Sequence, residues 1–449
     1  MNYAGRHTIA ALATAPGIGA VAIVRISGNE ALAIAKRLTG IEPTPRRAEL
    51  CEFRSADGRQ IDKGLLLFFP GPGSYTGEDV VELHAHGGPV VSDWLLETLH
   101  GYGARAAEPG EFTLRAFLND KLDLPQAEAV ADLVDSRSRL AARAALRSLR
   151  GRFSDEVAAV QAKLTELRVL IEAWLDFPDE EIDLATQDAL AVRLAAIQSD
   201  LEALVAGAKR GSALSDALSV AIGGPPNAGK SSLLNRLAGY DAAIVTDVPG
   251  TTRDTVRERL SLDGVAIDIV DTAGLRTAAD PVEREGVRRA QRELGRADHT
   301  LWVSDIRAGL QAAFANASAE LAADLPYTLI LNKVDLTAEA GNAFEHGHCR
   351  VIQLSALTGA GVELLIEHLK TLAGWSGEEA GTFSARRRHL EALQRARAAL
   401  QRSSDHLPGA LELAAEELRG AQTALSELTG ELTSDDLLGE IFSSFCIGK

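Results

Sequence analysis

The chain has 449 residues, 46% of them hydrophobic, which is enough for two to four domains with several buried cores. The formal net charge of −17 is not typical of a nucleic-acid binder, so any RNA contact must use local basic patches or a second protein. The polar segment after Met1 and the short apolar runs predict neither a secretory signal nor a membrane span. Cys51, Cys349 and Cys446 lie far apart and match no metal spacing. We therefore expect a cytoplasmic protein without a membrane partner.

Residues 1–118 alternate apolar runs with Gly/Pro turns. Ala20–Val24 and Leu65–Phe69 are typical of buried strands, and Pro70–Gly73 is typical of a loop. This region predicts an α+β domain.

From about Lys121 to Gly211 the sequence is rich in Ala and Leu, a composition typical of helices. The same pattern returns after Phe383. Apolar residues there recur at helical spacing. The stripes are Val160, Leu164, Leu167, Leu170, Ile171, Trp174 and Leu175; Leu390, Leu393, Ala396 and Leu400; and Ala414, Leu418, Ala421, Leu425 and Leu428. Since each stripe needs a partner face, we predict one helical domain built from residues 119–215 and 379–449.

The region between these flanks, residues 216–378, alternates short strands with helices. This pattern predicts an inserted α/β domain with a mostly parallel sheet, and a multidomain α/β protein as a whole. The expected strands are Leu218–Ile222, Ile267–Val270, Thr300–Ser304, Tyr327–Leu331 and Val351–Leu354.

A phosphate-binding loop opens the inserted domain. Gly224–Ser231 fits G-x-x-x-x-G-K-[ST] and lies between a predicted strand and a predicted helix. Backbone N–H groups from Asn227, Ala228, Gly229 and the helix start at Ser232 would cradle phosphates. Lys230 would reach the β and γ phosphates, and the Ser231 hydroxyl would bind Mg²⁺.

Three further motifs follow predicted strands in the order that a GTP-binding domain requires. Asp271-Thr272-Ala273-Gly274 would meet Mg²⁺ and the γ phosphate, and Ser355-Ala356-Leu357 would contact the base. In Asn332-Lys333-Val334-Asp335, the Asp335 carboxylate would accept hydrogen bonds from guanine N1–H and its amino group. Adenine offers no donor at N1, so this motif predicts GTP as the substrate.

A switch loop is expected between the phosphate loop and Asp271. Its residues Thr246, Asp247, Val248, Pro249, Gly250, Thr251 and Thr252 include a hydroxyl, Thr252, suited to Mg²⁺. Leu275 stands where related GTPases carry a glutamine that orients water. Glu283 is a candidate for that task, although its spacing alone favours a solvent-exposed helix residue. A monovalent cation held by Asn227 and loop carbonyls would neutralise the developing charge.

With these motifs, the chain resembles the MnmE/TrmE family of tRNA-modifying GTPases. The other segments that carry the resemblance are Arg25–Gly28, Gly77–Val80, His86–Pro89, Pro109–Phe112, Asn119–Asp123, Asp176–Glu180, Thr433–Gly439 and Phe445–Lys449. The resemblance implies a homodimer whose GTPase domains pair with K⁺ in the arginine-finger position. It also implies a bound 5-formyl-tetrahydrofolate and an FAD-dependent partner, MnmG, in a heterotetramer. Together they would add an aminomethyl or carboxymethylaminomethyl group to C5 of the wobble uridine, position 34, of certain tRNAs.

The resemblance assigns roles to particular residues of this chain. It makes Glu283 the residue that orients water, and Ser231 and Thr252 the Mg²⁺ ligands. The implied K⁺ contacts are Asn227, Thr246, Val248 and Thr251, and the implied folate contacts are Arg25, Glu82, Lys121 and Lys449. Cys446 is either a reactive thiol or a small packed residue. His84 and His86 share one face of a strand, but a metal there would need ligands that the sequence does not identify.

Two other functions fit the same GTP motifs. One is a GTPase switch in ribosome assembly that performs no substrate chemistry, and the other is a folate enzyme with a regulatory GTPase domain. Folate binding would separate the switch from the modification enzyme. Arg386-Arg387-Arg388 and Arg395 would suit RNA, although basic residues on a helix more often face solvent.

Overall fold

The computed structural model describes most of the chain. The described residues are 7–136, 138–176, 184–215, 218–239, 257–263, 265–271, 295, 297–322, 325–337, 340–347, 349–373, 375, 383–430, 435–443 and 445–448. They form two compact units. The first comprises Met1–Ala131, Ser148–Leu201 and Ala392–Lys449, and the second comprises Asp132–Arg147 and Glu202–Glu391.

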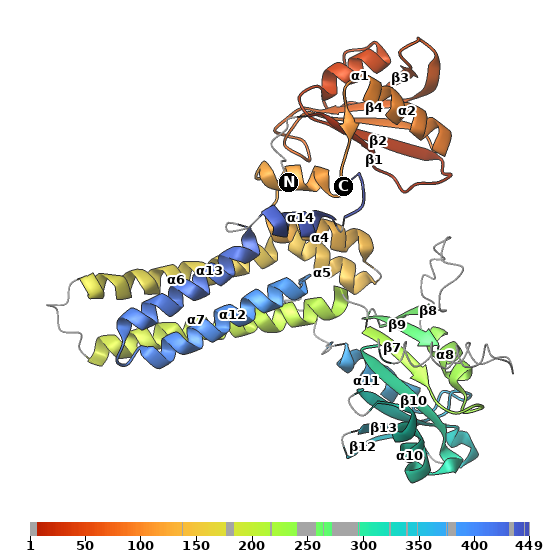
Figure 1. The fold of residues 1–449 in the computed structure, drawn as a ribbon, viewed down its shortest axis with the longest axis vertical. Coiled ribbons are helices and arrows are strands. Elements are labelled where there is room, and N and C mark those ends of the chain that lie inside the picture. The colour runs from red at the N-terminus through yellow and green to blue at the C-terminus, as the bar shows by residue number, and fades with distance from the viewer. Residues whose placement is uncertain are drawn as a thin grey trace. The chain divides into compact units, whose positions relative to one another are not determined.

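The amino-terminal part is a six-stranded sheet in the order β3-β4-β5-β2-β1-β6, antiparallel except where β6 joins β1. The strands are β1 (Ile9–Leu12), β2 (Val21–Ser27), β3 (Glu49–Arg54), β4 (Gln60–Phe69), β5 (Val80–His86) and β6 (Arg105–Ala106). Helices α1 (Ala31–Thr39) and α2 (Pro89–Gly101) pack on it and share a core with Val24, Leu66 and Leu83 (Figure 1). The predicted α+β character is confirmed.

Long helices from the two flanks of the chain pack on one another. Gln161 Nε2 of α6 (Arg152–Asp176) donates to Ser426 Oγ of α13 (Leu411–Thr429) over 3.0 Å. Gln198 Nε2 of α7 (Leu184–Ser215) donates to the Leu400 carbonyl of α12 (Arg387–His406) over 3.2 Å. The shorter helices are α3 (Glu111–Leu118), α4 (Leu124–Asp135), α5 (Arg139–Leu149) and α14 (Asp435–Ser443). The prediction of a helical domain made from two chain segments is confirmed.

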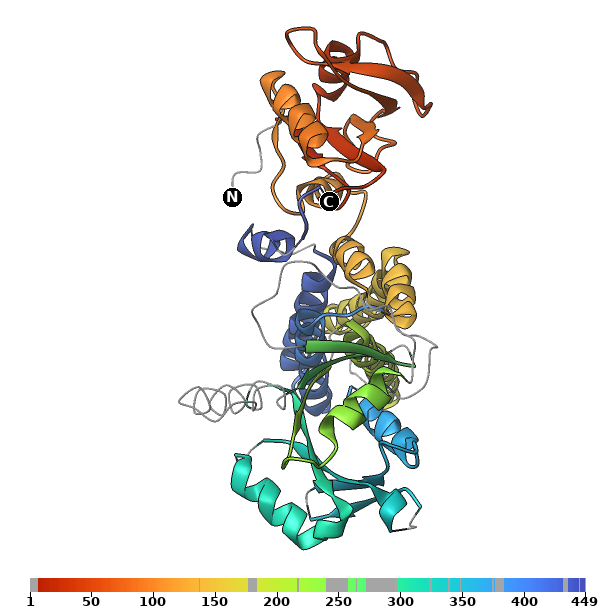
Figure 2. The same ribbon diagram turned by 90° about the vertical axis from the view of Figure 1, so that its right-hand side faces the viewer.

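The inserted part is a seven-stranded sheet in the order β12-β13-β11-β10-β7-β9-β8. Its strands are β7 (Leu218–Gly223), β8 (Arg257–Leu262), β9 (Val265–Asp271), β10 (His299–Asp305), β11 (Tyr327–Asn332), β12 (Asn342–His346) and β13 (Cys349–Leu354). The five inner strands are parallel, as predicted. Their side chains alternate between two cores, one with α8 (Lys230–Ala238) and α11 (Val362–Leu372), the other with α10 (Leu310–Glu320). Figure 2 shows α10 on the opposite side of the sheet from α8 and α11.

The two edge strands, β8 and β12, are antiparallel to their neighbours and have no counterpart in the sequence prediction. Their sequences, RERLSL and NAFEH, lack the apolar run that marks a strand buried on both faces. The inserted sheet also packs against α5, which lies before residue 216 in the sequence. Ala141 and Ala144 of α5 form an apolar cluster with Val265 and Trp375.

None of the helices within the described ranges is both long enough and apolar enough to cross a membrane.

Candidate functional site

The strands that carry the predicted GTP motifs end at one edge of the inserted sheet. Asp271, the last residue of β9, pairs with Ile222 near the end of β7, and Asp305, the last residue of β10, pairs with Asn332. Asn332 in turn pairs with Leu354 at the end of β13. The ends of these strands therefore lie together at the carboxyl edge of the sheet, where open α/β domains bind ligands.

The phosphate loop has the backbone that its motif requires. Asn227 and Gly229 both have positive φ, 59° and 94°, and α8 begins directly at Lys230. The Lys230 ammonium donates to the carbonyls of Gly224 and Pro225 over 2.9 and 2.8 Å, so it lies across the loop. The amides of the first turn of α8 face the same loop, which is the arrangement that binds phosphate. Ser231 and Ser232 are exposed at the start of this helix.

A buried asparagine joins the phosphate loop to two segments, Asn332–Asp335 and Ser355–Leu357, that together are called the base loop here. Asn332 Nδ2 donates to the Ala228 carbonyl over 2.9 Å, and Asn332 Oδ1 accepts from the amides of Lys333 and Ala356 over 2.8 and 3.0 Å. A Cβ on Gly229 would lie 2.3 Å from Asn332 Nδ2, so only glycine fits at that position. One side chain therefore sets the spacing of three loops.

The base loop presents an exposed carboxylate beside a buried hydroxyl. Asp335 lies in a 3₁₀ turn (η3, Val334–Leu336) and accepts a hydrogen bond from Ser355 Oγ at 2.5 Å. Ala356 is buried and Leu357 is exposed. The structure thus brings Asn332, Lys333 and Asp335 together with the Ser355–Leu357 loop, as the sequence predicts for a guanine site.

Two side chains that the sequence analysis did not select also belong to this region. Arg236 of α8 donates from Nε to the Ala356 carbonyl over 3.0 Å and from Nη2 to the Leu357 carbonyl. Asp305 accepts from Lys333 Nζ over 2.9 Å. The hydrogen bond from Arg307, and after it that from Lys333, holds the pKa of Asp305 well below its ordinary value, against an opposing effect of burial. Neither residue is part of a linear motif, so only the fold reveals them.

Several predicted site residues lie outside the described residues. They are Thr246, Asp247, Val248, Pro249, Gly250, Thr251, Thr252, Thr272, Ala273, Gly274, Glu283 and Lys449. For Asp271 the structure gives the place in the sheet only.

The amino-terminal sheet brings together some of the residues that the resemblance assigns to folate. Arg25 of β2 pairs with Glu82 of β5, with Nε and Nη2 at 3.0 and 2.9 Å from Glu82 Oε1. The Gly448 carbonyl lies 3.5 Å from Arg25 Nη1, so the end of the chain reaches this pair. The Arg25 guanidinium also lies 5.7 Å from the centre of the Tyr75 ring. Lys121 donates to the Pro72 carbonyl over 3.0 Å.

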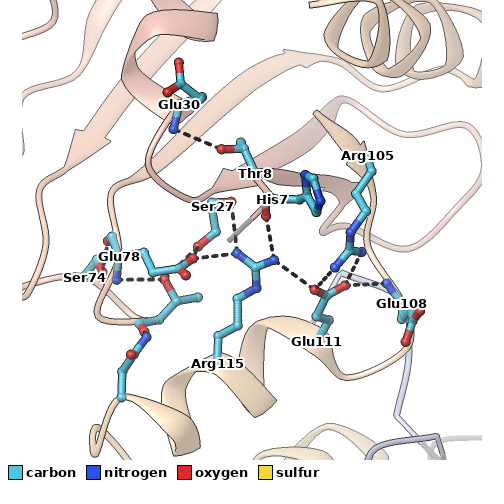
Figure 3. A network of polar contacts seen from close by, with 12 residues as sticks. His7, Thr8, Ser27, Glu30, Ser74, Glu78, Arg105, Glu108, Glu111 and Arg115 are labelled. Atoms are coloured by element: carbon cyan, nitrogen blue, oxygen red, sulfur yellow. Dashed lines mark hydrogen bonds and ion pairs between the residues drawn. The ribbon is translucent and has the colours of Figure 1, made fainter. Parts of the chain in front are cut away.

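A partly buried charged network fixes the loop before β5 and the start of α3 (Figure 3). Arg115 donates to Glu78 Oε2 and to Glu111 Oε1 over 2.8 and 2.9 Å, and Ser27 Oγ donates to Glu78 Oε2 over 2.8 Å. Burial raises the pKa of Glu111, but hydrogen bonds from Arg105, the Glu108 amide and Arg115 outweigh it, so the pKa lies below its ordinary value. Tyr75 extends from the same loop, and its hydroxyl lies 2.9 Å from Thr113 Oγ1 of α3.

The contacts of the remaining candidates, Cys446, His84 and His86, do not indicate a functional site. Cys446 is exposed, and its carbonyl accepts from the Gly110 amide over 3.4 Å. His86 Nδ1 lies 2.8 Å from Asp62 Oδ1, and His84 Nε2 lies 3.5 Å from Glu82 Oε2. Across the described part of the chain, no group of three or more His, Cys, Asp or Glu residues has the geometry of a metal site.

The sheet order, the phosphate loop and the base loop define a P-loop GTPase domain carried by a larger multidomain protein. Comparison with known families identifies the rest of the chain. The description "MnmE helical domain" matches residues 124–446, and "GTP-binding protein TrmE N-terminus" matches residues 8–121. The chain belongs to the MnmE/TrmE family.

Curated relatives agree over almost the full length. A tRNA modification GTPase MnmE from Nitrosococcus oceani is 54% identical over 444 residues, covering 98% of this chain and 97% of that protein. Its counterpart from Alkalilimnicola ehrlichii is 52% identical over 446 residues, covering 99% and 100%. Among solved structures, the G domain of the T. maritima FeoB iron transporter matches 35% of this chain and 99% of that chain, at 24% identity and a TM-score of 0.27.

Proposed function

We propose that this protein hydrolyses GTP in a K⁺-dependent reaction and couples that hydrolysis to tRNA modification. The observation that supports it most is the near full-length similarity to proteins named tRNA modification GTPase, together with the junction of phosphate and base loops at Asn332. We place the domain limits at residues 1–118, 119–215, 216–378 and 379–449, the second and fourth segments forming one helical domain.

The described residues suit the nucleotide chemistry. Lys230 already lies across the phosphate loop, where its ammonium would turn from two carbonyls to the β and γ phosphates. The exposed Ser231 hydroxyl at the start of α8 is an oxygen donor of the type that Mg²⁺ prefers, and Thr252 would supply a second. Mg²⁺ held there would neutralise charge on the phosphates. Asp335 would accept from the two guanine donors.

K⁺ would occupy the position that an arginine finger fills elsewhere. Asn227 is exposed, and its backbone has a φ of 59°. We propose Asn227, Thr246, Val248 and Thr251 as its contacts and Glu283 as the residue that orients water. A second GTPase domain in a homodimer would close the site.

The amino-terminal domain would bind 5-formyl-tetrahydrofolate through Arg25, Glu82, Lys121 and Lys449. A pterin edge offers paired donors and acceptors, and Glu82 and Arg25 present a carboxylate and a guanidinium side by side. With MnmG supplying flavin chemistry, the product would be an aminomethyl or carboxymethylaminomethyl group on C5 of uridine 34. This activity belongs in the cytoplasm.

The test is GTP turnover by the full-length protein in K⁺ and in Na⁺ at equal ionic strength, with Glu283→Ala alongside. We expect strong stimulation by K⁺ that is lost in the variant. Equal rates of GTP turnover in the two salts would refute the proposed role of K⁺ in hydrolysis. Binding of 5-formyl-tetrahydrofolate, measured by calorimetry on the same protein, separates a modification enzyme from a ribosome-assembly switch, which has no use for folate. One-carbon turnover without tRNA or MnmG would instead favour a folate enzyme with a regulatory GTPase domain.

A further inference from the structure

We propose that Asp305 is a positioning residue for the guanine nucleotide. Its carboxylate holds the Lys333 ammonium against the phosphate loop, so that the loops after β7, β10 and β11 are joined before the nucleotide arrives. This inference rests on the proposed assignment of Asn332–Asp335 to the guanine base.

The sheet topology places Asp305 between the two nucleotide loops. β10 lies between β7 and β11, and its last residue pairs with Asn332. Lys333 Nζ is 2.9 Å from Asp305 Oδ2 and 2.7 Å from the Asn227 carbonyl. The side chains of Asp305 and Lys333 are only 20% and 28% exposed, so solvent screens this pair less than a surface ion pair.

The carboxylate is itself held in one orientation. Asp305 caps a 3₁₀ turn (η2, Ile306–Ala308), and its Oδ1 accepts from the Arg307 amide over 3.0 Å. Arg307 also donates from Nε to Oδ1 over 3.0 Å and from Nη2 to Oδ2 over 2.7 Å. These bonds direct Oδ2 toward Lys333.

Lys333 needs such a partner because its side chain is long and flexible. A lysine side chain has several rotatable bonds, and ordering it when a ligand binds costs conformational entropy. Lys333 also has a backbone φ of 74°, in the left-handed region that residues other than glycine seldom adopt. A charge-assisted bond to Asp305 orders the side chain in the free protein, so less is lost on nucleotide binding.

This arrangement predicts an effect on binding without an effect on chemistry. Through Lys333 the pair reaches the Asn227 carbonyl, whereas the Lys230 ammonium donates to the carbonyls of Gly224 and Pro225. Loss of the Asp305 charge should therefore speed nucleotide release and raise KM, while kcat at saturating GTP stays unchanged.

The alternative is that Asp305 only stabilises its own turn. Asp305→Asn separates the two roles because an asparagine keeps the size and the Oδ1 acceptor that caps η2 but removes the charge that holds Lys333. Glu345→Gln is the matched control, since Glu345 forms an exposed ion pair with Arg350 at 2.9 Å in the same domain, away from the nucleotide loops.

The experiment uses the full-length protein and a fluorescent GDP whose dissociation is followed by stopped flow. We expect Asp305→Asn to release GDP about tenfold faster and to raise KM for GTP by a similar factor, the effect of one lost charged hydrogen bond. Glu345→Gln should behave like the parent protein, because its ion pair with Arg350 is exposed and lies away from the nucleotide loops. Lys333→Met should reproduce the faster release, and the two changes combined should not add.

Unchanged GDP release in Asp305→Asn, with a lowered melting temperature, would show a structural role only and overturn the proposal. So would additive effects in the double variant. If Asp305→Asn does not fold, Lys333→Met provides the same test, and GDP release at the parent rate there overturns the proposal as well. Asp335→Asn is measured in parallel, because failure to lose the preference for GDP over ADP would refute the base assignment itself and not the role of Asp305.

Discussion

In the inserted domain, the nucleotide residues come from short segments that each follow a parallel strand, and the sheet alone brings them together. In the amino-terminal domain, Arg25 and Glu82 come from neighbouring antiparallel strands, and the third neighbour, Gly448, arrives from the other end of the chain. A parallel sheet gathers the ends of its strands at one edge by construction. An antiparallel sheet has no such edge, so Arg25 and Glu82 meet across neighbouring strands, and Gly448 joins them from distant sequence.

The largest expected effect is on GTP turnover, and it should leave the amino-terminal domain unaffected. Lys230→Ala removes the ammonium that lies across the phosphate loop, and GTP turnover should fall about a thousandfold because charge on the transferred phosphoryl group loses its partner. Turnover is measured with saturating Mg²⁺ and K⁺, and binding of 5-formyl-tetrahydrofolate should stay unchanged. A variant that loses both activities would contradict the independence of the two sites.

Acid should weaken the inserted domain through a buried histidine. Burial, and then the neighbouring His368, lowers the pKa of His299 to about 4. The folded state therefore binds fewer protons than the unfolded state between pH 6.5 and 4, and up to about 3 kcal/mol of stability is lost as the pH falls through this window. Urea unfolding at pH 7.5, 6 and 5 measures the loss.

His299→Gln should flatten this dependence, since glutamine does not titrate and can still reach Thr328, whose Oγ1 lies 2.8 Å from His299 Nε2. His86→Gln, at an exposed histidine of the amino-terminal sheet, serves as control. An unaltered pH slope in His299→Gln would assign the acid sensitivity to other groups.

A smaller effect should be confined to the amino-terminal domain. Glu82→Ala leaves Arg25 without its carboxylate, and affinity for 5-formyl-tetrahydrofolate should fall about tenfold, as for one charged hydrogen bond. Calorimetry gives the affinity, and KM for GTP should not change. Parent-like folate affinity would remove Glu82 from the site.

The smallest effect tests the role of the chain end. Gly448 has a φ of 97°, and a Cβ there would lie 2.2 Å from the Leu12 carbonyl, so Gly448→Ala must displace the tail from Arg25. Folate affinity should fall only about threefold, because a single peripheral contact is lost. Gly409→Ala, where nothing lies within 4 Å of an added Cβ, is the control, and equal behaviour of the two variants would exclude the tail from binding.

Much of the nucleotide domain was predictable because its signals are local. Apolar runs marked β7, β9, β10, β11 and β13, and the P-loop and base motifs follow these strands directly. The edge strands β8 and β12 were not predicted, because their sequences, RERLSL and NAFEH, carry polar residues and resemble loops. Asp305 and Arg236 were not selected from the sequence because neither belongs to a linear motif. Only the fold shows that they contact the nucleotide loops.

By itself, the sequence determined the fold class, the GTPase motifs and the family, because periodicity and contiguous motifs involve residues that are close together in the chain. It named Arg25 and Glu82 only through resemblance, since neither residue has a local pattern that indicates a ligand. Their pairing, the arrival of the chain end beside them and the link from Asp305 through Lys333 to Asn227 were decided by tertiary structure. These contacts join residues from about 30 to more than 400 positions apart, so no local sequence pattern indicates which of them meet.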